Sequence, residues 1–131
     1  MNSNAFQIKL SYQVNETVLE DEQVDIEDVA EHLQRQIEDQ VNTDEFSTVV
    51  NTTGDVVTYV VGACSPIIDL EARLMLDDVG SRANVETFVD RCLRRLPNIN
   101  KQYCWDDFYS NDRVEHIDDI LLISDEVLAV D

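Results

Sequence analysis

The chain has 131 residues, with 28 Asp or Glu against 9 Lys or Arg, and therefore a formal net charge of −19. Hydrophobic residues make up 44% of it, which argues against intrinsic disorder, and the length suits one domain with its own core. Nucleic-acid affinity depends on Lys and Arg contacts to phosphates, so this charge disfavours direct binding to nucleic acid.

The acidic residues are concentrated in two segments. Residues 15–50 contain 12 acidic residues and one Arg, and residues 105–131 contain nine acidic residues and one Arg. The segment between them, residues 51–104, is nearly neutral, with seven acidic and six basic residues. A field of this kind keeps a protein soluble and attracts basic partners, but it carries no direct information about the fold.

The N-terminal segment predicts a half-buried strand over residues 5–14. From Phe6 to Val14, apolar residues alternate with polar ones, which is the period of two that side chains follow along a strand. Residues 15–24 are acidic and show no hydrophobic period, so they predict a solvated connection.

A helix is predicted over residues 26–41, with Asp25 as its N-cap and acidic residues in its first turn. Its apolar residues form one stripe at helical spacing: Ile26, Val29, Ala30, Leu33, Ile37 and Val41. The opposite face is acidic, relieved only by His32 and Arg35, and its carboxylates are expected to be exposed: Glu27, Asp28, Glu31, Glu38 and Asp39.

The next segment is rich in Val, Thr, Tyr and Phe, which favour strands. Residues 46–50 and 56–63 predict two strands, with a turn at residues 53–55 between them. Residues 67–76 predict a third strand, because the apolar side chains from Ile68 to Leu76 occupy every second position. Three successive strands with short links predict an antiparallel meander.

A second helix is predicted over residues 84–96, capped by Asn84 and ended by Pro97. Its stripe of apolar residues is clear: Val85, Phe88, Val89, Cys92, Leu93 and Leu96. Three arginines lie near its end, and we favour a solvated helix end that pairs with acids over a phosphate-binding patch: Arg91, Arg94 and Arg95.

Aromatic and acidic residues are interleaved between Tyr103 and Tyr109. Four of the nine aromatic residues of the chain fall in this stretch, together with Asp106 and Asp107. Rings beside carboxylates suit an interface that pairs with Arg or Lys, the interpretation we favour for Asp107 and Tyr109. Trp105 fits better as a residue that closes one end of the core.

The C-terminal segment predicts either a short helix from residue 113 or a hairpin with arms at 120–123 and 127–130. The order strand, helix, three strands, helix and mixed acidic tail predicts a single α+β domain over residues 1–131. In it, an antiparallel sheet of about four strands packs against two amphipathic helices, and the acidic C-terminal segment is of mixed structure.

No motif for catalysis, a cofactor or a metal rises above background. The Cys and His residues lack the paired spacing of zinc sites, and Cys92 on the apolar stripe predicts a buried structural thiol. There is no Gly-rich phosphate loop and no local nucleophile motif. We therefore expect that the protein is not an enzyme and has no cofactor or bound metal.

The start of the chain lacks a basic region followed by an apolar run, and no segment approaches the ~20 apolar residues of a membrane span. The odd number of Cys residues, without paired spacing, disfavours a disulfide framework. We therefore expect a cytoplasmic protein without membrane contact.

In composition and size the chain resembles small DNA-mimic inhibitors, such as anti-restriction and anti-CRISPR proteins, which are often phage-encoded. The resemblance implies that carboxylates stand in for phosphates and bind the basic surface of a nucleic-acid-binding protein. The expected partner-binding residues come from the first helix and the C-terminal part: Glu27, Asp28, Glu31, Glu38, Asp39, Asp106, Asp107, Tyr109, Asp118 and Asp119. The alternatives are an immunity protein that neutralises a basic toxin such as a nuclease, and a haloadapted acidic domain without mimicry.

Overall fold

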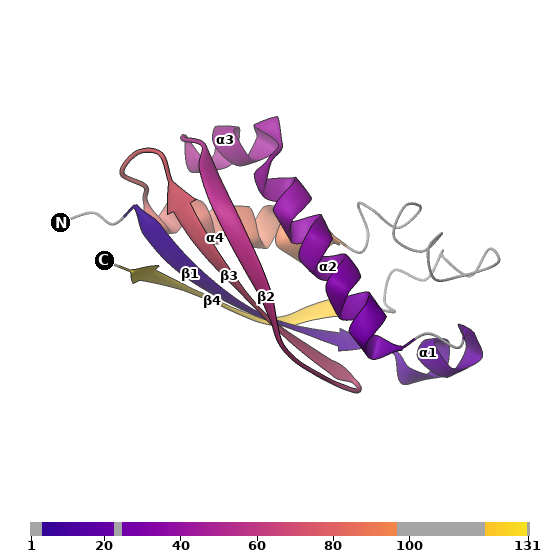
Figure 1. Cartoon of the computed structure of the whole chain (residues 1–131). Helices are drawn as coiled ribbons and strands as arrows, with labels where there is room; N and C mark the ends of the chain where they lie inside the picture. The colour runs from indigo at the N-terminus through magenta and orange to yellow at the C-terminus, as the bar shows by residue number, and fades with distance from the viewer. Residues whose placement is uncertain (1–3, 23–24, 97–119, 131) are drawn as a thin grey trace.

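The structure is a computed structural model that describes residues 4–22, 25–96 and 120–130. Its centre is a four-stranded antiparallel sheet in the order β2-β3-β1-β4 (Figure 1). The strands are β1 (Ala5–Val14), β2 (Gly54–Cys64), β3 (Ile67–Leu76) and β4 (Ile120–Val130). The helices are α1 (Glu16–Glu22), α2 (Ile26–Val41), α3 (Asp44–Val50) and α4 (Arg82–Arg91), which is followed by a 3-10 turn, η1 (Leu93–Arg95). The predicted α+β class is confirmed.

One face of the sheet is buried by helices and the other is open. The alternate residues of β1 and β3 that point to the helices are all buried, from Phe6 to Val14 and from Ile68 to Leu76. α2 packs mainly on β2 and α4 on β4, while α3 contacts both helices. The helices therefore gather on one side of the sheet, as Figure 1 shows. The apolar stripes predicted for the two long helices are confirmed as parts of this core.

The predicted meander of residues 46–50, 56–63 and 67–76 is wrong, because residues 46–50 lie in helix α3. Its other two strands, β2 and β3, do pair antiparallel, and β1 lies between β3 and β4. Lys9 in the middle of β1 is paired with Glu71 on one side and with Glu126 on the other. Only β2 and β3 are consecutive neighbours. In β1 and β3, buried and more exposed residues alternate most regularly along the strand. Both strands lie in the centre of the sheet, where the side that faces the helices is most completely buried.

Residues 46–50, predicted as a strand, lie in helix α3. Its first turn is stabilised by the hydroxyls of Ser47 and Thr48, which both donate to the carbonyl oxygen of Asp44 at 2.9 Å. Phe46 and Val50, four residues apart, share the buried side of the helix. Tertiary packing of this short stripe overrides the strand preference of its Val and Thr residues. The turn before β2 accordingly lies earlier than predicted, at Asn51, whose φ of 71° ends the helix.

The connection predicted for residues 15–24 contains the short helix α1. The side chain of Asn15 accepts a hydrogen bond from the Thr17 backbone N–H at 3.0 Å, so Asn15 acts as the N-cap. In α4 the N-cap is Ser81 and not Asn84, so the helix begins two residues earlier than predicted. It also ends earlier, because residues 93–95 tighten into η1.

At the C-terminus, both predicted arms of a hairpin belong to one continuous strand, β4, so the hairpin is wrong. Ile123 is an extra residue between Leu122, paired with Tyr12, and Ser124, paired with Ser11. The Ser-Asp-Glu stretch that suggested a turn follows this bulge and pairs in regular register with residues 9–11 of β1. The alternative helix, from residue 113, begins outside the described residues.

Candidate functional site

The solvent side of α2 carries most of the predicted binding residues. Its buried stripe faces the sheet, with five apolar side chains at most 4% exposed: Val29, Ala30, Leu33, Ile37 and Val41. Four predicted acids are exposed on the opposite side: Glu27, Asp28, Glu31 and Asp39. Glu38 is only half-buried rather than fully exposed, and His32, predicted for the acidic side, is buried with Gln36. The buried side of α2 therefore includes the polar residues His32 and Gln36 in addition to its apolar stripe.

The acidic surface continues onto the neighbouring helices, which the sequence did not mark as part of it. α1 adds exposed Glu16 and Glu20, and α3 adds exposed Asp44 and Glu45 in its first turn. We call the nine exposed carboxylates of these three helices and of the α2 N-cap the acidic helical face: Glu16, Glu20, Asp25, Glu27, Asp28, Glu31, Asp39, Asp44 and Glu45. The signal was present in the sequence, since the net charge of residues 15–50 already included them.

The carboxylates of the acidic helical face are not neutralised by arginines. Within the described ranges, the ion pairs belong to Arg73, Arg82 and Arg94, none of which lies on α1, α2 or α3. Arg35, the single Arg of residues 15–50, has its guanidinium 3.5 Å from Nδ1 of His32. Among the residues that the structure describes, the face therefore presents an excess of negative charge to solvent.

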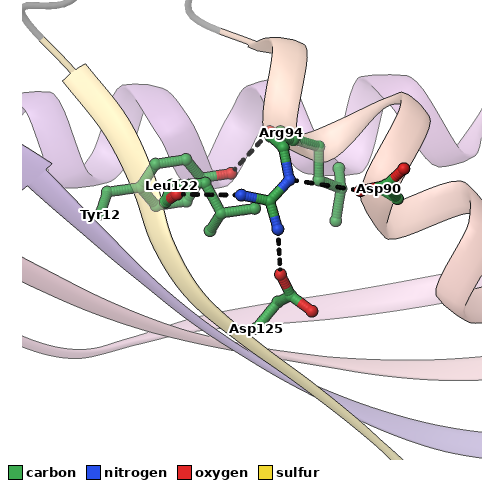
Figure 2. A network of polar contacts seen from close by, with 6 residues as sticks. Tyr12, Asp90, Arg94, Leu122 and Asp125 are labelled. Atoms are coloured by element: carbon green, nitrogen blue, oxygen red, sulfur yellow. Dashed lines mark hydrogen bonds and ion pairs between the residues drawn. The ribbon is translucent and has the colours of Figure 1, made fainter.

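Arg94 forms ion pairs with acidic residues, as we predicted for the arginines near the end of the second helix. Figure 2 shows its guanidinium between two carboxylates, with Nη2 at 2.6 Å from Asp125 and Nε at 3.4 Å from Asp90. It also donates to the carbonyl oxygen of Leu122 at 3.3 Å, and so connects η1 to β4. Next to it, the buried hydroxyl of Tyr12 donates to the carbonyl oxygen of Leu93 at 3.1 Å. Arg94 therefore serves the packing of β4, whereas Arg91 and Arg95 of the same group are exposed.

The described acids of the C-terminal segment do not extend the acidic helical face. Asp125 is paired with Arg94, and Glu126 is exposed next to Lys9 on the open side of the sheet. The remaining predicted binding residues lie outside the described residues: Asp106, Asp107, Tyr109, Asp118 and Asp119. The same holds for Trp105 and its predicted place in the core.

The two described thiols differ in environment. Cys92 is buried, as predicted, and burial together with a hydrogen bond to Glu45 raises the pKa of its thiol to about 11. Cys64 is exposed at the end of β2. Over the part of the chain that the structure describes, no three His, Cys, Asp or Glu side chains are grouped as metal ligands. In the same residues, no helix is both long and apolar enough to cross a membrane.

Comparison of the chain with protein-family models, with curated proteins and with solved structures found no match.

Proposed function

We propose that the acidic helical face binds the basic nucleic-acid-binding surface of another protein and competes with nucleic acid for it. In this proposal the protein is an acidic inhibitor of the anti-restriction or anti-CRISPR type and not an enzyme. The observation that carries the proposal is the accumulation, on three consecutive helices on one side of the sheet, of exposed carboxylates that form no ion pair with another described residue.

The spacing of the carboxylates supports mimicry of a phosphate backbone. Asp25 and Asp39 delimit five exposed acids of the face on α2 and its N-cap, and they are separated by about 21 Å along the helix axis at 1.5 Å per residue. The mean interval of about 5 Å is comparable to the ~3.4 Å axial rise between successive phosphates of one DNA strand. A groove of Lys and Arg residues that follows a nucleic-acid strand would meet a similar linear charge density on α2.

The rigidity of α2 also supports the proposal. The helix is anchored by its buried stripe, and the amide of Gln34 donates to the Thr58 carbonyl oxygen of β2 at 2.7 Å. Carboxylates on an anchored helix lose less entropy on binding than the same charges on a flexible tail. Part of the ordering cost of association is therefore met when the protein folds.

The uneven distribution of charge favours a binding role over salt adaptation. Adaptation to high salt calls for a generally acidic surface, whereas here the open side of the sheet carries Lys9 and Arg73 among its acids. Residues 15–50, in contrast, contain 12 acids and one Arg. Concentration of charge on one side is what electrostatic steering to a basic partner requires.

The test begins with capture of the partner from a host lysate on the immobilised full chain, followed by titration of the purified partner with duplex DNA present. We expect the protein to displace the DNA, and its affinity to fall steeply as salt rises. Glu27→Gln with Glu31→Gln should weaken binding roughly tenfold, since each exposed pair contributes up to about 1 kcal/mol.

The matched control is Glu86→Gln with Asp90→Asn on α4. Both double variants remove two exposed carboxylates four residues apart on a helix, so they change the net charge equally. The control should bind almost as the parent does. If both double variants lost affinity equally, the net charge and not the acidic helical face would determine binding. A partner that binds DNA and this protein simultaneously would refute competition. A captured toxin nuclease would make the protein an immunity protein.

A further inference from the structure

Exposed apolar side chains of three strands, β2, β3 and β4, lie on the open side of the sheet. Val57 and Tyr59 of β2 are 51% and 47% exposed, Met75 of β3 is 55% exposed and Val130 of β4 is 44% exposed. Charged residues of the same strands share this side, and no helix covers it among the described residues. We call this surface the open sheet face.

A hollow lies at one end of the open sheet face. Ala5 of β1 is paired with Met75 of β3 and with Val130 of β4, so a methyl group lies between two larger side chains. The resulting depression has a volume of about 350 Å³ and is bordered also by Gln7 and Arg73. Its walls are mainly apolar, and it can accept one unbranched apolar side chain.

The open sheet face is less one-sidedly acidic than the acidic helical face, because it carries Lys9 and Arg73 beside its four acids, Asp55, Asp69, Glu71 and Glu126. Glu71 lies opposite Lys9 in the sheet, and hydrogen bonds from Gln7 and Arg73 lower the pKa of its carboxyl group. The guanidinium of Arg73 also lies over the ring of Tyr59, 5.7 Å from its centroid. In a molecule of net charge −19, such a face is where a second copy meets the least repulsion.

The edges of the sheet are less suited to self-association than its open face. On β2 the outward carbonyl of Thr58 accepts from Gln34, and on β4 the carbonyl of Leu122 accepts from Arg94. Each edge strand thus has a backbone acceptor already occupied by a helix side chain, which blocks continuous pairing with another strand.

We propose that two copies of this chain pack back to back through the open sheet face, around a two-fold axis parallel to the strands and between β3 and β1. Such an axis lays β3 of each copy over β1 of the other. In the observed register, Met75 then points into the hollow over Ala5 of the second copy, and Glu71 faces Lys9 of the second copy. Both contacts occur twice, as an isologous interface requires.

The same axis lays β2 over β4. Val57 lies in the row of Arg73, Gln7 and Leu128, so it meets Leu128 of the second copy. In the neighbouring rows, Tyr59 meets Glu126 and Asp55 meets Val130, so the apolar contact between β2 and β4 is that of Val57 with Leu128, and opposite charges meet near the centre. The inference does not depend on the proposed function, and it leaves the acidic helical faces of both copies on the outside of the dimer.

The area of the face is sufficient for a dimer. Four strands spaced about 4.8 Å apart, each about ten residues long at about 3.3 Å per residue, form a face of roughly 600 Å². Two such faces bury about 1,200 Å² in total, at the lower end of the range for stable, specific interfaces. Small interfaces with few apolar contacts are typically weak, so we expect a dissociation constant of about 10 µM.

The experiment is sedimentation equilibrium of the full chain up to about 100 µM, well above that dissociation constant. We expect a mass equal to two 15.0 kDa chains, and tighter association as salt rises from low to physiological strength, because repulsion between the copies is screened. Binding to a basic partner should instead weaken as salt rises, so the opposite salt dependences allow the two proposals to be tested independently. A monomer at the highest concentration overturns the dimer and leaves the face to a different partner.

Substitutions then test the register. Met75→Lys should raise the dimer dissociation constant by about tenfold or more, since it brings a charge into the hollow. Val79→Lys is the matched control, because Val79 is 57% exposed on the loop after β3, and it should leave the dimer intact. Lys9→Glu should dissociate the dimer, and Lys9→Glu with Glu71→Lys should restore it. This arrangement is overturned if the folded double variant Lys9→Glu with Glu71→Lys stays monomeric. It is also overturned if Met75→Lys and Val79→Lys change the dissociation constant equally.

Discussion

The hydrogen bond from Tyr12 to η1 provides a sharp test of how the helices are attached to the sheet. Tyr12 is fully buried, and its hydroxyl donates to the carbonyl oxygen of Leu93 at 3.1 Å. Tyr12→Phe removes this donor and keeps the ring in the core. The Leu93 carbonyl retains the backbone N–H of Leu96 as a donor, so it is not left without a partner. The cost should therefore be about 1 kcal/mol, below the up to 3 kcal/mol of an orphaned buried acceptor.

For a chain of this size, a loss of about 1 kcal/mol lowers the melting temperature by roughly 3–5 °C. The assay is urea and thermal unfolding followed by circular dichroism, with an unchanged dependence on urea as the sign that compactness is unchanged. Tyr59→Phe is the control, because Tyr59 is half exposed on the open sheet face, and its stability should stay within about 0.5 kcal/mol of the parent. Equal stability of Tyr12→Phe and the parent would refute the assigned role of the hydroxyl.

Three other measurements test the surface and the packing. Raising the ionic strength, which shortens the Debye length from about 30 Å at 0.01 M to about 8 Å at 0.15 M, should raise the melting temperature, and no change would contradict an unpaired acidic helical face. Gly54→Ala should destabilise the fold by about 1–3 kcal/mol, because the new Cβ would lie 2.5 Å from the Met75 carbonyl oxygen, whereas Gly62→Ala meets no atom within 4 Å and should be neutral or slightly stabilising. Alkylation mapped by mass spectrometry should modify Cys64 in the native state and Cys92 only on unfolding. Because the folded pKa of Cys92 is about 11 against an ordinary value of 9.0, its contribution to stability should be complete below pH 9.0 and decline between these values, a slope that Cys92→Ala should reduce.

The sequence by itself determined the elements with a strong hydrophobic period. The alternation in residues 5–14 and 67–76 and the stripe of residues 26–41 each encode a face that must be buried, so these elements were predictable from local pattern. The acidic side of α2 followed from the same pattern, because the residues opposite a buried stripe face water.

Tertiary structure decided what depends on contacts between distant residues. Residues 46–50 have the composition of a strand, but Phe46 packs edge-on against Phe88 of α4 at 5.0 Å between ring centroids, and the segment is helical. The C-terminal Ser-Asp-Glu stretch has the composition of a turn, but Arg94 pairs with Asp125 and a bulge keeps the strand continuous. In both places local preference was weak and a partner far along the chain decided the conformation.

The strand order has the same origin. Local pattern states which side of a strand is buried but not which strand lies beside it, since pairing is a property of two segments. Only the order β2-β3-β1-β4 brings Ala5 between Met75 and Val130, and Lys9 between Glu71 and Glu126. The α2 part of the acidic helical face was therefore visible in the sequence. Its parts on α1 and α3 depended on helices that the local pattern did not predict, and the open sheet face is assembled from four separate strands and exists only in the folded chain.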